Sequence, residues 1–196
     1  GIEQRGFQED LTVRDRNHYE RCDIALLSVP SLDAPAETTL SVIPGPDPAR
    51  HEKNWMPFVV DGVLHILYLC SPTVVGHLNA NSQLVIDSST SGPPAATHFR
   101  GGSQGVPFNG GYLFLVHEVT FFGTQRVYSH RFIHLTSSIT KSGDRRWDIT
   151  SLSCPFYFRE MGIEFAAGLA TDANDIVASF GVRDAEAWLV RMSANQ

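Results

Sequence analysis

Cysteine is scarce in this sequence, and its scarcity excludes two kinds of protein. The chain has 3 cysteines, Cys22, Cys70 and Cys154, which stand far apart among apolar or strand-like residues. No CxxC pair and no Cys/His spacing typical of a metal site is present. An odd number of separated cysteines does not favour a disulfide framework. We therefore expect buried free thiols in a reducing compartment, and no metal site.

Long hydrophobic runs are also missing. The longest strongly apolar run, Val63 to Cys70, contains His65 and is far shorter than the roughly 20 residues that span a bilayer. No signal-peptide pattern and no Asn-x-Ser/Thr sequon is present. These absences predict a cytoplasmic, soluble protein without a membrane partner.

Basic residues are too few and too scattered for a nucleic-acid surface. Lys and Arg number 15 against 21 Asp and Glu, the formal net charge is −6, and the sequence pI is about 5.7. No basic run is longer than the pair Arg145-Arg146. Binding to a phosphate backbone needs a clustered basic surface, so we expect no nucleic-acid partner. A local anion site made of a few residues stays compatible with this acidic total.

What the chain does contain is a hairpin that recurs three times. Each copy has a short apolar strand, a turn containing Gly, Asp or Asn, and an apolar return strand. The copies are Met56 to Val60 with Val63 to Leu69, Val106 to Phe108 with Tyr112 to Val116, and Phe165 to Ala170 with Ile176 to Phe180. A hairpin recurring every ~40–50 residues is typical of a β-propeller. The return strands are apolar at both parities, as sheets packed between neighbouring blades require.

The repeat predicts an all-β fold, a β-propeller of about four blades that is open or truncated. We expect one domain over residues 1–196, with 1–52 as an irregular first blade and 53–196 as the regular blades. A β-sandwich with similar hairpins is the competing interpretation. The tail, Arg183 to Met192, has the composition of a short helix, but the repeat makes it the outer strand of the last blade. Further strands are expected at Ile24 to Val29, Leu40 to Ile43, Val127 to Leu135 and Trp147 to Phe158.

Polar side chains gather in the middle of the chain. Arg100 stands on a Gly-Gly turn, and His117 ends a strand that looks buried. Tyr128, His130 and Arg131 follow on a second strand, where Tyr128 and His130 share a face because alternate residues point the same way. Imidazole and guanidinium groups beside a flexible glycine turn are suited to hold an oxyanion or a sugar. The simpler interpretation is a hairpin whose polar ends face water.

Four short elements also occur in a fixed order along most of the chain. They are Glu52-Lys53-Asn54-Trp55-Met56-Pro57-Phe58, Arg100-Gly101-Gly102-Ser103 followed by Gly110-Gly111-Tyr112-Leu113 and Val116-His117, Gly162-Ile163-Glu164, and Ser179-Phe180-Gly181-Val182-Arg183-Asp184. These elements resemble motifs of the inverting β-mannoside phosphorylases, which are five-bladed propellers. The closer resemblance is to propeller domains that are found with, or act as, glycosyltransferases.

The resemblance implies a phosphorylase mechanism on mannose-type sugars. Inorganic phosphate would attack the anomeric carbon while one carboxylic acid protonates the leaving oxygen. Phosphate is then the co-substrate, and no cofactor is expected. Lys53 falls on the family's lysine and is the first candidate to grip phosphate, with Asn54 beside it. Arg100 stands at the turn where the family approaches its substrate. His117 matches the family's strand-end histidine, the alternative being a core histidine satisfied by backbone.

Further residues receive less specific roles. Tyr128, His130 and Arg131 could contact sugar or phosphate, or could lie along a blade edge. Glu164 is either a ligand or a structural acceptor. Asp184 matches the family's final aspartate, where a sugar-hydroxyl contact is expected, and a turn-capping aspartate is the alternative.

The chain departs from the family at the general acid. The family's acid lies in an early Glu-Asp-Pro-Arg element, and the nearest candidate here is Asp10, without the proline or the arginine. Two functions therefore stay open: a glycoside phosphorylase or glycosyltransferase-like enzyme, and a non-catalytic carbohydrate- or anion-binding propeller that has lost the acid. An incomplete propeller leaves strand edges unpaired, so we also expect a homodimer.

Overall fold

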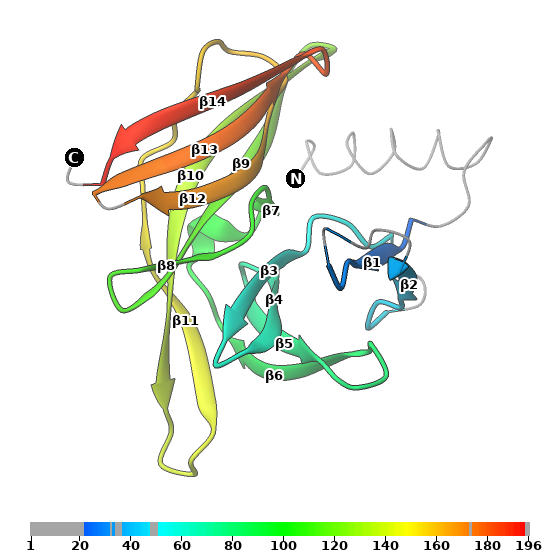
Figure 1. Cartoon of the computed structure of the whole chain (residues 1–196). Coiled ribbons are helices and arrows are strands. Elements are labelled where there is room, and N and C mark those ends of the chain that lie inside the picture. The colour runs from blue at the N-terminus through cyan, green and yellow to red at the C-terminus, as the bar shows by residue number, and fades with distance from the viewer. Residues whose placement is uncertain (1–21, 32, 34–36, 48–50, 173, 195–196) are drawn as a thin grey trace. The chain divides into compact units, whose positions relative to one another are not determined.

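The computed structural model describes residues 22–31, 33, 37–47, 51–172 and 174–194 (Figure 1). Apart from 3-10 structure at Glu37 and in the short turn η2 (Pro94–Ala96), the regular structure of these residues is β-strand. The predicted all-β fold is therefore confirmed for the described residues. Contacts divide the chain into two compact units, residues 1–53 with 79–84, and residues 54–78 with 85–196.

The first unit contains a two-stranded antiparallel sheet. It consists of β1 (Ile24–Ser28) and β2 (Thr39–Ile43), paired with Ile24 opposite Ile43. Both strands lie where the sequence predicts them. β1 ends shortly before Pro30, which has no N–H to donate to a ladder.

A four-stranded meander opens the second unit. Its strands, in spatial and chain order, are β3 (Met56–Val60), β4 (Val63–Leu69), β5 (Thr73–Leu78) and β6 (Leu84–Thr90). The β3–β4 hairpin has the predicted bounds. Its turn residues Asp61 and Gly62 have φ of 51° and 79°, as a type I′ turn requires. β5 and β6 continue the meander through a stretch for which the hairpin repeat makes no prediction.

A five-stranded sheet follows, built around one long hairpin (Figure 1). Its strands are β7 (Arg100–Gly101), β8 (Val106–Phe108), β9 (Gly111–Phe122), β10 (Gln125–Ile139) and β11 (Arg145–Leu152). β9 pairs with β10 on one side and with β7 and β8 on the other. β9 runs past the predicted end at Val116 because strand-forming residues continue to Phe122. β11 ends at Leu152, before the predicted end at Phe158, but the chain stays beside β10, where Phe156 exchanges two backbone hydrogen bonds with His130 across Pro155.

The last sheet has three strands. They are β12 (Glu164–Asp172), β13 (Asp175–Val182) and β14 (Glu186–Ser193), in that order. The tail is thus a strand, as the repeat predicts and its composition does not. Along β13, alternate residues are buried, from Ile176 to Val182, so one face of this sheet is covered.

The five-stranded sheet is covered on both faces. On one face Phe114 and Trp147 pack around Phe58 of the meander, with ring centroids 5.4 and 5.3 Å from its ring. On the other face Leu113 packs with Leu169 and Ala178 of the last sheet. Double coverage explains why the centre of β9 is apolar at both parities.

The cysteines only partly follow expectation. All three are free, but Cys70 alone is buried, and burial raises the pKa of its thiol to about 12. Cys22 and Cys154 are exposed, because they lie outside the packed strands. Among the described residues, no helix is long and apolar enough to cross a membrane.

Candidate functional site

Three polar side chains form a row across the five-stranded sheet. Strand register sets Arg100 of β7 directly opposite His117 of β9, and His117 directly opposite His130 of β10. Directly opposed residues in neighbouring strands point to the same face. We call Arg100, His117 and His130 the polar row.

Two more residues of β10 lie on the same face as the row. Tyr128 is two residues from His130, and its ring centroid is 5.3 Å from that of His117. Arg126 is two residues further back and lies close enough to Arg100 to act on its charge. Sequence reasoning missed Arg126, although its alternation with Tyr128 and His130 could have marked it. The predicted candidates Arg100, His117, Tyr128 and His130 are thus brought together.

Aromatic rings enclose the two imidazoles. The ring of Phe165 on β12 lies 5.3 Å from His117, and Phe158 and Phe156 lie 4.7 and 6.0 Å from His130, measured between centroids. His117 is 4% exposed and His130 is 0% exposed. Nδ1 of His117 and both ring nitrogens of His130 are buried without a well-aligned hydrogen bond among the described residues, although the Glu164 backbone lies near enough to His130 to raise its pKa. A core histidine normally has hydrogen-bond partners for its ring nitrogens, and Nδ1 of His117 has none among the described residues.

The electrostatics of the row follow from this burial. Burial, then the neighbouring His130 and Arg100, lower the pKa of His117 to about 3. Burial likewise lowers the pKa of His130 to about 4, although Glu164 opposes the shift. Burial, with a contribution from Arg126, also lowers the pKa of Arg100, whereas Tyr128 acts to raise it. At neutral pH both imidazoles are therefore uncharged, and the arginines supply the positive charge.

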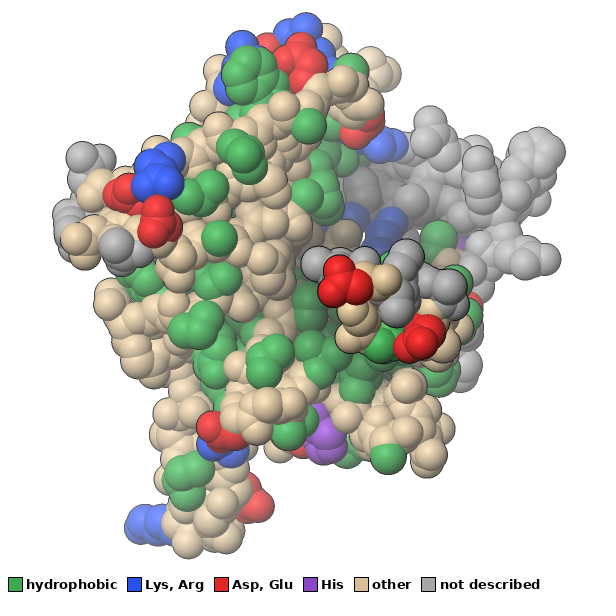
Figure 2. Space-filling model, viewed as in Figure 1, with side chains coloured by type: hydrophobic (Ala, Val, Ile, Leu, Met, Phe, Trp, Pro, Cys, Tyr) green, Lys and Arg blue, Asp and Glu red, His purple; other side chains and the backbone are tan. Residues whose placement is uncertain are grey.

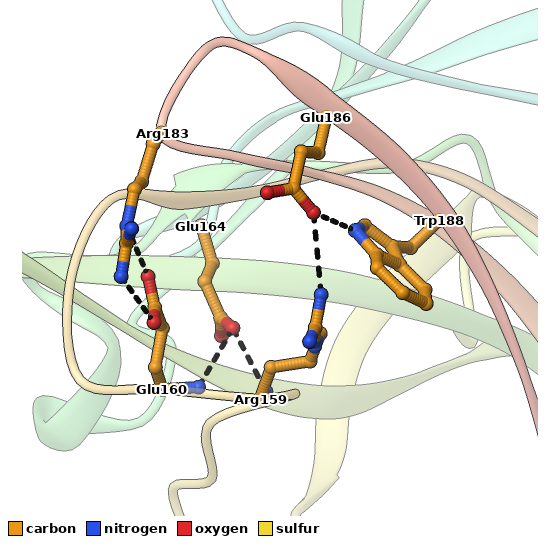
Figure 3. Close-up of polar contacts among 6 residues, drawn as sticks. All are labelled: Arg159, Glu160, Glu164, Arg183, Glu186 and Trp188. Carbon is orange, nitrogen blue, oxygen red and sulfur yellow. Dashed lines mark hydrogen bonds and ion pairs between the residues drawn. The ribbon is translucent and has the colours of Figure 1, made fainter.

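Glu164 accepts backbone hydrogen bonds, which fits the structural-acceptor alternative that the sequence left open. Its carboxylate accepts hydrogen bonds from the backbone N–H groups of Phe158, Arg159 and Glu160, at 2.8, 2.8 and 3.0 Å. Figure 3 shows the bonds from Arg159 and Glu160. The side chain is 0% exposed. Both oxygens are thus committed to holding the loop that precedes β12.

Ion pairs close the same loop over the end of the last sheet (Figure 3). Arg183 donates twice to Glu160, at 2.6 Å each. Arg159 lies 3.9 Å above the Trp188 ring, and Glu186 accepts from both of these side chains. Charged side chains gather at this end of the β12–β14 sheet and again at its other end, where Arg191 pairs with Asp172 and Asp175 (Figure 2).

Two predicted residues lie away from the row. Arg131 points to the opposite face of β10, where it donates to Glu118 at 3.2 Å and to the Ser153 carbonyl at 3.0 Å. Alternation along β10 makes this unavoidable once His130 faces the row. Asp184 is exposed in the β13–β14 turn with φ of 55°, and it therefore fits the turn alternative.

Of the Lys53-Asn54 motif, the structure places Asn54 near the polar row. The Asn54 carbonyl lies so close to Gly101 that a Cβ there would collide with it, which brings Asn54 beside the strand that carries Arg100. Asn54 itself has φ of 61°, a conformation that asparagine tolerates. Lys53 is exposed. It belongs to the first unit, whose first segment ends at this residue, and the polar row belongs to the second unit. Asp10 lies outside the described residues.

This arrangement is suited to binding. Two arginines can grip an anion, tyrosine and phenylalanine rings can pack on a sugar, and neutral imidazoles can exchange hydrogen bonds with hydroxyl groups. Across the described parts of the chain, no group of three or more His, Cys, Asp or Glu residues could hold a metal ion. No family model, no curated protein and no solved structure matches the chain.

Proposed function

We propose that the chain is a non-catalytic module of propeller type that binds a carbohydrate bearing an anionic group, of the mannose or sugar-phosphate class. The observation that carries the proposal is the polar row with its buried, unpartnered imidazole nitrogens. Leaving a buried polar atom unpaired costs about 1–3 kcal/mol. A fold retains such a cost most readily where a ligand meets those atoms.

The sheet order supports a propeller rather than a sandwich. A β3–β6 meander, a β8–β11 meander and a β12–β14 meander follow one another along the chain. The middle sheet packs with one face on the first and the other face on the third. Face-to-face packing of successive meanders is the arrangement of propeller blades, and a two-layer sandwich has no such middle layer.

The carboxylates favour binding over turnover. A glycoside phosphorylase needs an acid near the anomeric oxygen. Glu164 is committed to three backbone N–H groups, Glu118 pairs with Arg131 on the opposite face, and Asp184 lies in an exposed turn. None of these three carboxylates is therefore positioned as the general acid that a phosphorylase needs.

The groups around the row suit a sugar that carries an anion. Arg100 and Arg126 provide forked donors for phosphate oxygens. Tyr128 and Phe165 are partly exposed at the edge of the row, where their rings can cover an apolar sugar face. His117 lies deeper and offers a neutral nitrogen to a hydroxyl or phosphate oxygen.

Calorimetric titration with mannose 1-phosphate, mannose and inorganic phosphate tests the proposal. We expect mannose 1-phosphate to bind more tightly than mannose, and Arg100→Gln to weaken the anionic ligands at least tenfold. Arg146→Gln is the matched control, since Arg146 is an exposed arginine of the same sheet that pairs with Asp148. Equal binding by the Arg100→Gln and Arg146→Gln variants would reject the site.

The same samples separate the enzyme from the module. Release of phosphate from mannose 1-phosphate in the presence of mannose acceptors, abolished in Asp10→Asn, would establish turnover and reject the non-catalytic assignment. Binding without release supports the module.

The proposal includes a homodimer. β14 is an edge strand of its sheet among the described residues, and Leu189 at its centre is 74% exposed. Although β14 carries Glu186 and Arg191 near its ends, an exposed strand edge with apolar side chains at its centre tends to pair with another strand. Light scattering across concentrations should give twice the monomer mass, and a constant monomer mass would remove this part of the proposal.

A further inference from the structure

We propose that β14 pairs antiparallel with β14 of a second copy of the chain, with Leu189 of each copy at the two-fold axis between them. The inference rests on the homodimer of the proposed function and deepens it, because it fixes which residues of the two copies lie opposite one another. It depends on three observations of the second unit: the direction of the backbone groups of β14, the covers on other sheet edges, and the side chains along β14.

The ladder between β13 and β14 fixes the direction in which each backbone group of β14 points. Ala194, just after β14, donates its N–H to the carbonyl of Asn174, which lies directly opposite it. Residue pairs along an antiparallel ladder alternate between bonded and non-bonded pairs, so the even-numbered residues of β14 bond to β13. The N–H and C=O groups of Ala187, Leu189 and Arg191 therefore point away from β13, to the outer edge of the sheet (Figure 1).

Two other edge strands of the second unit have their outward backbone groups covered by neighbouring segments. Two carbonyl groups of β3 accept hydrogen bonds, from the Gly105 N–H at 2.8 Å and from the Tyr112 hydroxyl at 2.9 Å. On β11, Trp147 donates its N–H to the Ser88 hydroxyl at 3.1 Å, and its carbonyl accepts from the Thr90 hydroxyl at 3.0 Å. Such covers keep a strand edge from pairing with another chain.

The three-stranded sheet has such a cover on one side. On β12, the side-chain amide of Gln104 donates to the Leu169 carbonyl, and the Leu169 N–H donates back to the side-chain oxygen of Gln104. On β14, no hydrogen bond from another described segment reaches the outward groups of Ala187, Leu189 or Arg191. Leu189 is also 74% exposed. β14 is therefore the edge of this sheet that can accept a further strand.

The side chains of β14 suit a second copy of the same strand. A two-fold interface uses the same patch on both copies, and directly opposed residues of an antiparallel pair share a face. One residue must therefore lie opposite itself. With Leu189 at the axis, the two exposed leucines meet on one face, and Trp188 lies opposite Val190 of the second copy on the other. Aromatic side chains opposite β-branched ones stabilise sheets.

Neighbouring symmetric registers are less favourable. With Val190 at the axis, Leu189 of one copy lies opposite Arg191 of the other. Arg191 pairs with Asp172 and Asp175 at 3.0 and 2.9 Å, and a leucine beside it would displace water from these charges. A register shifted the opposite way places the last residues of β14, from Arg191 on, opposite a turn of the second copy instead of a strand.

Disulfide cross-linking tests the register. The exposed cysteines are removed as Cys22→Ser and Cys154→Ser, and the buried Cys70 is kept. In this background Leu189→Cys should give a covalent dimer when oxidised glutathione is added, because bonded residue pairs lie about 5.5 Å apart between Cα atoms and a disulfide needs about 4.4–6.8 Å. Ala187→Cys is the matched control, and it should give none, because its two copies would lie about 14 Å apart along the strands.

Two further measurements support the cross-link. Ala187→Cys mixed with Arg191→Cys should give a covalent heterodimer, because the proposed register sets these two residues opposite one another. Leu189→Lys should weaken the dimer at least tenfold in light scattering, without a change in melting temperature at concentrations where the parent is a monomer. Val59→Lys is its control, since Val59 is 57% exposed on β3, whose edge is already covered, and it should leave the dimer unchanged.

The outcomes separate this inference from the proposed function. Cross-linking of Ala187→Cys alone that is as efficient as that of Leu189→Cys overturns the register. A dimer in light scattering that Leu189→Lys leaves intact, with no cross-link in Leu189→Cys, overturns the pairing through β14 and leaves the homodimer standing. A monomer at all concentrations overturns both the pairing and the homodimer, and the ligand titrations still decide the binding site.

Discussion

Glu164 and His130 are equally deep in the molecule, each 0% exposed, and they meet the demands of burial in opposite ways. Glu164 accepts three backbone hydrogen bonds. His130 has no well-aligned hydrogen bond on either ring nitrogen within the part of the chain that the structure describes, although the Glu164 backbone lies near enough to raise its pKa. Burial of a carboxylate is tolerated only with such donors, whereas an imidazole can shed its charge and stay neutral.

The two residues also stand side by side, since Glu164 acts on the charge of His130. Glu164 holds the loop before β12 through its hydrogen bonds. His130 lies on the face that carries Arg100 and His117, and its ring nitrogens have no well-aligned hydrogen bond among the described residues. The contrast separates residues that the fold needs from residues that the proposed site needs.

The largest expected effect comes from breaking the structural member of this pair. Glu164→Ala removes the acceptor of three N–H groups, and we expect the free energy of unfolding to fall by about 3–5 kcal/mol. Glu164→Gln keeps one acceptor oxygen and should lose roughly half as much. Urea titrations at pH 7.5 measure both.

Glu160→Gln is the control for charge on the same loop. Glu160 pairs with the largely exposed Arg183, and exposed pairs contribute about 0–1 kcal/mol. A loss in Glu164→Ala no greater than that in Glu160→Gln would mean that the buried hydrogen bonds do not hold the loop.

The sequence predicts the position of His130 better than the role of Glu164. Tyr128 and His130 share a face by simple alternation, so their pairing was predictable. The hairpin turn at Asp61-Gly62 was predictable too, because its conformation depends on the turn residues themselves. The second turn lies at Asn109-Gly110, one residue before the predicted Gly110-Gly111, because Gly111 already pairs with Phe108. The side chains that β10 contributes to the site can therefore be predicted from the local sequence.

Other features depend on contacts between distant segments. The register that sets Arg100 opposite His117 pairs residues 17 positions apart through the β8 excursion, and no local pattern specifies it. Glu164 could not be distinguished from a ligand, because its donors belong to a loop whose path is set by Phe158 stacking on Phe180 of β13. The ends of β9 and β11 also differ from the predicted ones, since β9 continues to Phe122 and β11 ends at Leu152.

The second prediction concerns the neutral half of the pair and has a definite sign. The unfolded pKa of histidine is about 6.5, while burial lowers the folded pKa of His117 to about 3 and of His130 to about 4. Between these values the unfolded chain binds more protons than the folded chain, so acid favours unfolding. The stability is fully present above pH 6.5 and is lost as pH falls toward 4. Each histidine should remove about 2 kcal/mol between pH 7 and pH 5.

Replacing one histidine sharpens the same prediction. Phe156 and Phe158 already pack on His130, so a phenylalanine there extends an aromatic cluster and removes two unpaired nitrogens. His130→Phe should lie within about 1 kcal/mol of the parent at pH 7.5, on the stable side, because hydrophobic replacement of unsatisfied polar groups is neutral or favourable. Its loss between pH 7 and pH 5 should be about half the parent's.

Urea titrations at pH 7.5, 6 and 5 on the parent, His130→Phe and His117→Gln decide the matter. If His130→Phe lowers the free energy of unfolding by several kcal/mol at pH 7.5, the imidazole has a hydrogen-bond partner that stabilises the fold, as Glu164 does. If it keeps the full pH dependence, the acid sensitivity arises elsewhere. A variant that is stable, less sensitive to acid and weaker in anion binding would assign the buried imidazole to the site, because only a role in binding links those three results.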